Sequence, residues 1–152
     1  MARKSNNTAL NALAANQNSG LLDNKLSKTI TYAAATTGAV GATTLCTVTG
    51  VVALSIIGVC TTNLAGGTTI EVGTAASTAG AIAQTTPTDI DATDIWHDAS
   101  PDKSIELTSV IAQNIVTDDI IQTIGGSAIT AGVITYYILW APISSDGNVV
   151  IA

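Results

Sequence analysis

The stretch LCTVTGVVALSIIGVCTTNLAGGTTIEVG, residues 45–73, consists of short apolar and β-branched runs separated by glycine or polar pairs. Near its end, Thr69-Ile70-Glu71-Val72 alternates polar and apolar residues, as a strand with one buried face does. Residues 38–60 carry no charge and are long enough to cross a bilayer. Glycine and threonine interrupt them, however, which favours strands over one helix. We therefore expect no membrane span.

Similar runs continue along the chain at intervals of about 8–12 residues, with no amphipathic helix between them. Turn signals such as Gly66-Gly67, Gly125-Gly126 and Asp146-Gly147 separate them. This pattern predicts an all-β fold, an antiparallel β-sandwich or jelly roll formed by residues 29–152 as a single domain. The expected strands are residues 29–34, 43–49, 51–61, 68–73, 80–84, 104–112, 119–124, 133–140 and 148–151.

Composition and charge narrow the possible partners. The 152 residues are 47% hydrophobic and only 11% charged, which excludes general disorder and fits one domain. Residues 1–28 contain four basic residues and one acidic residue, whereas residues 29–152 contain one lysine and ten acidic residues. The acidic body should repel phosphates, and four scattered basic residues are a weak nucleic-acid footprint. Nucleic acid is therefore an unlikely partner.

Residues 1–28 are expected to form an N-terminal arm, either extended or a short helix. Its leucines bring too little apolar area for a core of its own, so the arm should dock on another protein or a neighbouring copy. The first 20 residues also lack the continuous apolar core of a secretory signal. The residues of the arm chosen as interface candidates are Arg3, Lys4, Leu10, Leu13, Leu21 and Leu22.

The residues needed for catalysis do not form a recognisable motif. His97 is the only histidine, and it accompanies neither a GxSxG elbow nor a Cys–His pair. Cys46 and Cys60 lack CxxC spacing, so we expect two buried thiols, with a disulfide as the alternative. So few cysteines favour intracellular synthesis. We expect a protein that is not an enzyme and has no cofactor.

Residues 87–102 read PTDIDATDIWHDASPD, and we expect a long acidic surface loop with one helical turn. An EF-hand would need a glycine at its turn and a glutamate at its end, and neither is present. A solvated loop is therefore the first interpretation, and no metal is assigned. A structural divalent cation and a docking patch for a basic partner remain open. The carboxylates concerned are Asp89, Asp91, Asp94, Asp98 and Asp102.

Residues 136–140, YYILW, hold the one aromatic cluster. On a strand, Tyr136 and Trp140 share one face, and Tyr137 lies on the other. Core packing is the first interpretation, and a subunit interface or ligand platform is the alternative. Apolar residues on both faces predict that this strand, like residues 51–60, is covered on both sides. We therefore take Trp96, Tyr136, Tyr137 and Trp140 as interface candidates.

Three stretches together resemble small virion proteins of tailed bacteriophages, in particular capsid decoration (cement) proteins. They are residues 45–75, the loop IWHDASP at 95–101, and ITAGVITYYILWAPISSDGNVV at 129–150. The resemblance implies a β-sandwich or jelly roll, made in the host cytoplasm, that forms a dimer or trimer on the capsid exterior. Its partners would be the major capsid protein and neighbouring copies of itself.

Two other functions remain open at this point. The chain could be a tail or head-fibre component whose arm inserts into the particle. It could also be a carbohydrate-binding β-sandwich in which Trp96 or Trp140 stacks on a sugar.

Overall fold

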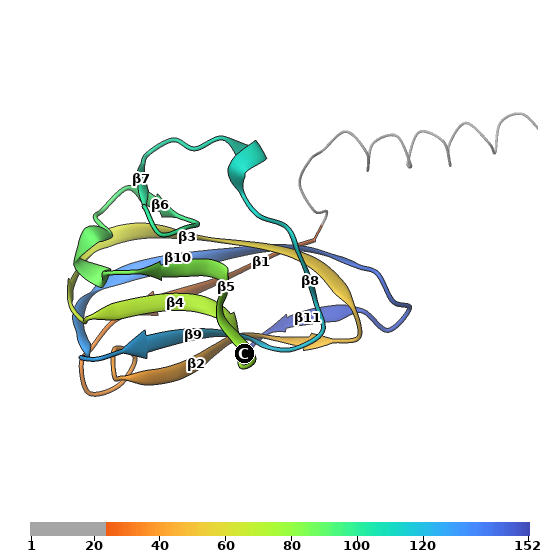
Figure 1. Cartoon of the computed structure of the whole chain (residues 1–152), viewed down its shortest axis with the longest axis horizontal. Coiled ribbons are helices and arrows are strands. Elements are labelled where there is room, and N and C mark those ends of the chain that lie inside the picture. Colours follow the sequence, from red (N-terminus) through yellow and green to blue (C-terminus); the bar gives the residue numbers. More distant parts are fainter. Residues whose placement is uncertain (1–23) are drawn as a thin grey trace, which may run out of the picture.

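The computed structural model describes residues 24–152, which form eleven strands and two short 3-10 helices (Figure 1). The strands make two antiparallel sheets that pack face to face around one core, so the predicted all-β sandwich is confirmed. Sheet A has six strands. Five of them lie in the order β1 (Asn24–Thr31), β10 (Ile129–Pro142), β3 (Val52–Gly66), β6 (Asp94–Trp96) and β7 (Asp102–Lys103). The sixth strand, β8 (Asn114–Val116), pairs with a different part of β3.

Sheet B has five strands, in the order β11 (Asn148–Ile151), β2 (Gly41–Thr49), β9 (Ile120–Gly125), β4 (Thr69–Thr74) and β5 (Ser77–Thr85). The helix η1 (Pro87–Asp89) provides the helical turn expected in the acidic loop, and η2 (Thr108–Val110) precedes β8. No helix among residues 24–152 is long and apolar enough to span a membrane.

The core lies between the sheets and follows from the alternation of side chains along each strand. Leu54 and Ile56 of β3 are buried from one sheet, and Ile70 and Val72 of β4 from the other. Gly58 affects the packing of Trp96, because the two residues lie opposite each other in the β3–β6 pair. A Cβ at Gly58 would lie 3.3 Å from Trp96 Cε3 and 3.1 Å from Ile134 Cγ2. The absence of a side chain there makes room for the indole.

One predicted strand is wrong, four begin earlier than expected, and the predicted surface loop 87–102 contains the buried strand β6. Residues 104–112 alternate like a strand but form a loop that includes η2, with both Ile105 and Leu107 exposed. The reason is that β6 and β8 already pair with β3 on that side of sheet A. At the other edge, β1 starts at Asn24, so residues 24–28, assigned to the arm from sequence, belong to the sheet.

The segment between β6 and β8 packs on the outer face of sheet A, above β3 in Figure 1. Ser55 points outward, since it lies opposite Leu139 and between the inward-facing Leu54 and Ile56. It is nevertheless buried, and its hydroxyl donates a hydrogen bond to the carbonyl of Ala112 at 2.7 Å. The chain therefore covers part of this apolar face with its own loop, which the two-sided pattern of residues 51–60 had assigned to a partner.

Candidate functional site

The aromatic interface candidates do not lie together on the surface. Trp96 and Tyr136 are fully buried, with ring centroids 6.2 Å apart, so their assignment as contact residues is corrected. The physical reason is that the side chains at both positions face sheet B. Trp140 is partly buried against the core, and Tyr137 is the member that projects outward, with 44% of its surface exposed. A sugar-stacking role for Trp96 is likewise excluded in this conformation.

The largest polar group inside the sandwich joins Tyr32, Gln122 and Tyr136. Both tyrosine hydroxyls donate to Gln122 Oε1, Tyr32 at 2.5 Å and Tyr136 at 2.6 Å. Burial raises the pKa of both phenols well above the ordinary range, so both remain protonated donors. This network links sheet A to sheet B through the core. The sequence analysis missed it, because residues 32, 122 and 136 are far apart in the chain.

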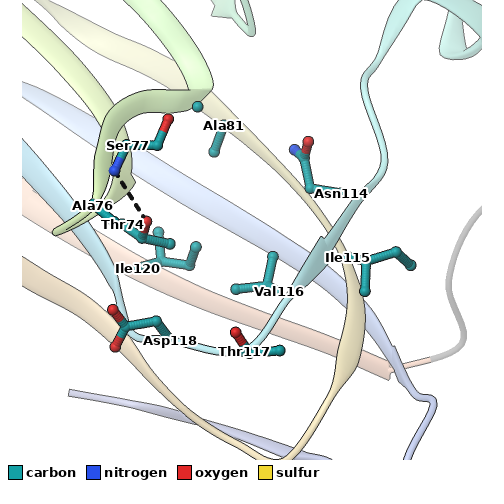
Figure 2. A pocket seen from close by; sticks show the side chains of 11 residues that line it. Thr74, Ala76, Ser77, Ala81, Asn114, Ile115, Val116, Thr117, Asp118 and Ile120 are labelled. Carbon is teal, nitrogen blue, oxygen red and sulfur yellow. Dashed lines mark hydrogen bonds between the residues drawn. The ribbon is translucent and has the colours of Figure 1, made fainter.

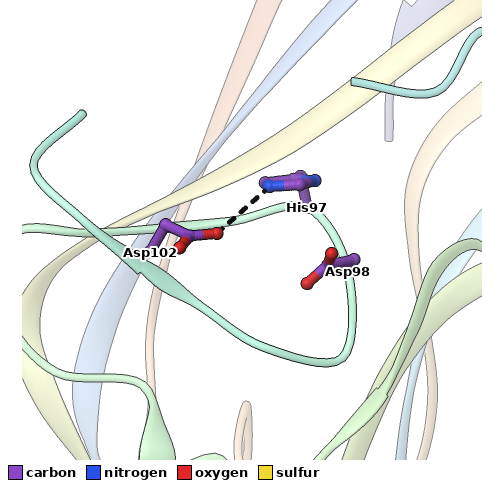
Figure 3. Close-up of side chains that lie close together, drawn as sticks. All are labelled: His97, Asp98 and Asp102. Carbon is purple, nitrogen blue, oxygen red and sulfur yellow. Dashed lines mark ion pairs between the residues drawn. The ribbon is translucent and has the colours of Figure 1, made fainter. Parts of the chain in front are cut away.

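His97 is buried and lies between two carboxylates of the same loop. Its Nε2 is 3.4 Å from Asp102 Oδ2 (Figure 3). The same nitrogen is 3.3 Å from Glu106 Oε2. A hydrogen bond with Glu106 raises the pKa of Asp102, whereas the backbone N–H of Leu107 lowers the pKa of Glu106. These contacts hold residues 97–106 in place over sheet A.

The acidic residues of the loop do not converge on one point. One ligand atom each from His97, Asp98 and Asp102 lies within 4.8 Å of the others, a donor set that suits a divalent cation. Asp91 and Asp94 instead pair with Lys103, at 3.5 and 3.3 Å. The loop is therefore neutralised in part by the chain's own lysine.

Cys46 and Cys60 are free, buried thiols, as expected, and the disulfide alternative is wrong for this structure. Cys46 lies on β2 of sheet B and Cys60 on β3 of sheet A. Burial raises the pKa of Cys46 to about 11 and also raises that of Cys60. Neither thiol is therefore an activated nucleophile.

Five of the nine exposed large apolar side chains among residues 24–152 belong to sheet A or to the segment between its strands β6 and β8. Ile105 is 81% exposed and Leu107 is 67% exposed, and both lie in the segment that covers the outer face of β3. Val110, Ile115 and Tyr137 are also exposed large residues of this side. We call these five residues the apolar patch. The outward residues of sheet B include the exposed threonines at positions 47 and 49, with the exposed Val150 beside Thr47.

The side of the sandwich between β1 and β11 is closed, and we call it the closed edge. Lys28 of β1 turns toward sheet B, where its Nζ donates to the oxygens of Thr44 and Ala152, each at 2.8 Å. One side chain thus ties the strand at the edge of sheet A to two segments of sheet B. From the sequence, Lys28 had been counted only as part of a basic arm.

The opposite side, between β5 and β8, is the open edge. A cavity of about 330 Å³ lies there, between the β4–β5 hairpin and the connection from β8 to β9 (Figure 2). Ala76, Ala81, Val116 and Ile120 supply apolar walls, and Asp118 lies at the polar end. Asn114 Nδ2 is shielded from solvent and has no hydrogen-bond partner. Figure 2 shows the Asn114 amide on the wall that faces Ala81 and Ser77.

The six arm candidates, from Arg3 to Leu22, lie outside the described residues. Among the described ones, the sequence analysis missed the lining of the open edge. The only signal was weak: residues 77–85, STAGAIAQT, contain no charge and no proline, the usual protections of an edge strand.

Comparison with known proteins gave no match, whether to a family model, to a curated protein sequence or to a solved structure.

Proposed function

We propose that this chain is a non-enzymatic structural protein of a virus particle. Its role would be that of a capsid decoration (cement) protein, bound on the capsid exterior between subunits of the major capsid protein and in contact with copies of itself. The sequence resemblance to small virion proteins supports this proposal, and so does the distribution of apolar side chains over the surface.

The observation that carries the proposal is the apolar patch. Scattered exposed apolar residues are ordinary, but a cluster of large ones marks a contact surface on soluble proteins. Ile105 and Leu107 belong to a loop held in place by His97, so they are presented from a fixed base. Contacts that position the loop before binding reduce the conformational entropy that is lost when a partner binds.

Decoration of a lattice also suits the charge and the fold of the chain. A shell repeats the same contact many times, so that linked weak contacts give strong attachment overall. The acidic residues 29–152 have little attraction for nucleic acid, which fits a place on the outside of a shell. The patch would face the capsid, and the arm would reach a neighbour.

The test is to add the purified protein to shells that lack it and to measure their melting temperature. We expect binding and a higher melting temperature, and Ile105→Asp with Leu107→Asp should weaken binding at least tenfold. Val40→Asp is the matched control, because Val40 is exposed and apolar but is not in the patch. Failure to bind the shells would overturn the proposal, and so would equal loss with the control.

A further inference from the structure

Strand β5 is an edge strand of sheet B, and its pairing with β4 shifts register twice. Among the described strands it pairs only with β4, and its outer side carries no neighbour. Natural edge strands are kept from pairing by lysine, proline, bulges or short length. The edge strand β1 has Lys25 and Lys28, and β11 has only four residues. With nine residues, no charge and no proline, β5 lacks the other protections, and its regular portions leave an outer side to which a strand can be added.

The cavity of the open edge adjoins this edge strand. Extended peptides that add to a sheet edge gain affinity from backbone hydrogen bonds and specificity from pockets for alternate side chains. Ala76 and Ala81 of the hairpin, with Val116 and Ile120 on the opposite wall, form such an apolar pocket. Its volume of about 330 Å³ is enough for aliphatic side chains from an added strand.

Asn114 presents a hydrogen-bond donor to the cavity. Buried polar groups are nearly always paired, and an unpaired donor is unfavourable. The Nδ2 of Asn114 has no partner among the described atoms, and it lies on the wall of the cavity. A main-chain carbonyl of an added strand would satisfy it.

We propose that the open edge receives the N-terminal segment of a neighbouring copy, with residues 8–15 added as a strand beside β5. These residues read TALNALAA and are uncharged, like β5 itself. In an extended segment Leu10 and Ala12 point to one side, which suits the apolar cavity. Arg3 and Lys4 precede this stretch and complement the charge of Asp118 at the cavity mouth.

The arm leaves the body at the edge opposite the one where it would bind. The arm joins the body at Asn24 in β1, and β10 and β3 separate β1 from β8. At about 4.8 Å per strand the open edge is roughly 14 Å away across sheet A. On that face the segment between β6 and β8 covers part of β3, so a path within one chain would have to run over this segment.

An arm of 23 residues can extend up to roughly 75 Å and so can reach an adjacent molecule. Each copy would donate its arm from one edge and receive a neighbour's arm at the opposite edge. This is a head-to-tail contact, and such contacts close a ring or extend over a lattice. The inference rests on the proposed function only in that both require copies of the chain to meet.

The test places a photo-cross-linking benzoylphenylalanine at Leu10 of the full chain. Irradiation of a mixture of ¹⁵N-labelled and unlabelled protein should join residue 10 to peptides from 74–81 or 114–120 of a different molecule. The same probe at Thr47, exposed on sheet B, should give no such product. Cross-links within one molecule, cross-links elsewhere, or none at all would overturn the inference.

Two charge variants sharpen this test. Ala76→Lys and Thr117→Lys each place an ammonium beside the cavity at an exposed position outside the apolar patch, so both should fold. Each should lower the cross-link yield at least tenfold, and Thr47→Lys is the matched control that should not. An unchanged yield in both would overturn the inference. Shell binding without the cross-link would leave the proposed function standing, and a cross-link without shell binding would leave the inference standing.

Discussion

The two lateral edges of the sandwich differ in how their polar groups are satisfied and in which strands border them. At the closed edge, Lys28 donates two hydrogen bonds across the gap between the sheets, and short or lysine-bearing strands form the border. At the open edge, a long uncharged strand borders a cavity, and Asn114 Nδ2 has no partner. One edge is satisfied within the chain, and the other has groups that another chain could satisfy. One small domain can therefore satisfy its polar groups at one edge and leave groups at the other edge that another chain could bind.

The largest expected effect comes from breaking the polar network on the side of the closed edge. Gln122→Leu removes the acceptor of both tyrosine hydroxyls. The two hydroxyls lie 3.2 Å apart, so one can still donate to the other and one buried donor is left unpaired. An unpaired buried donor costs about 1–3 kcal/mol, and the link between the sheets is also lost, so we expect a loss of about 2–3 kcal/mol in the free energy of unfolding, measured with urea.

The control for this variant is Gln84→Leu. Gln84 is exposed on β5, so its replacement should change the free energy of unfolding by less than about 0.5 kcal/mol. Equal losses in the two variants would show that the network does not hold the sheets together.

The next effect concerns Lys28 itself. Lys28→Met keeps the aliphatic stem and removes two hydrogen bonds from a charged donor, so we expect a loss of about 2 kcal/mol. Lys25→Met is the matched control on the same strand, since Lys25 is exposed, and should cost almost nothing. Urea unfolding of both variants measures the difference. If Lys28→Met is as stable as its control, the edge is closed by packing alone.

A smaller effect should appear at alkaline pH. Burial raises the pKa of Cys46 from 9.0 to about 11, so the unfolded chain loses this proton first. The free energy of unfolding should therefore fall as the pH rises above about 9, until the folded thiol ionises near 11. We expect the melting temperature to drop by several degrees between pH 8.5 and 10.5.

The variant Cys46→Ala tests the origin of that drop. It should flatten the dependence of melting temperature on pH, and Cys60→Ala provides the comparison for the other thiol. Tyr32 and Tyr136 contribute in the same direction, because burial raises the pKa of both, so a residual slope above pH 10 is expected. An unchanged slope in Cys46→Ala would contradict the assignment of this pH dependence to Cys46.

The smallest effect is expected at the open edge. Asn114→Leu removes an amide whose nitrogen has no partner, so the free energy of unfolding of the isolated chain should stay within about 1 kcal/mol of its original value or rise. Asn63→Leu is the matched change on β3, where Asn63 Oδ1 accepts a hydrogen bond from Ala92 at 2.8 Å. That variant should lose about 1 kcal/mol in urea unfolding. A greater loss for Asn114 would mean that the open edge is already satisfied.

The strands that the sequence predicts best are those in which alternation and turn residues agree. Residues 148–151 form β11 as expected, and residues 43–49 lie within β2. Residues 104–112 alternate equally well yet form a loop, because alternation identifies a strand only where a sheet has a free neighbour for it. The same limit applies to Trp96, whose burial depends on the space that Gly58 leaves on another strand.

For the candidate site, the sequence predicted exposed apolar surface but assigned it to the wrong residues. Residues 136–140 attracted attention as an aromatic cluster, but only Tyr137 of them is strongly exposed. The exposed surface instead lies on Ile105 and Leu107, which had been assigned to a half-buried strand. The choice between inner and outer face depends on which segment covers the strand, and the sequence pattern does not contain that information.

By itself, the sequence determined the all-β class, most of the strands and the contrast between a basic start and an acidic body. These depend on side-chain alternation, turn residues and charge, which are local properties of the chain. Only the tertiary structure decided which edge is closed and which is open. Lys28 meets Ala152, 124 residues away, and β5 comes to lie beside residues 114–120 through the packing of two sheets. Contacts of that range arise when the sheets pack, and no periodicity along the chain encodes them.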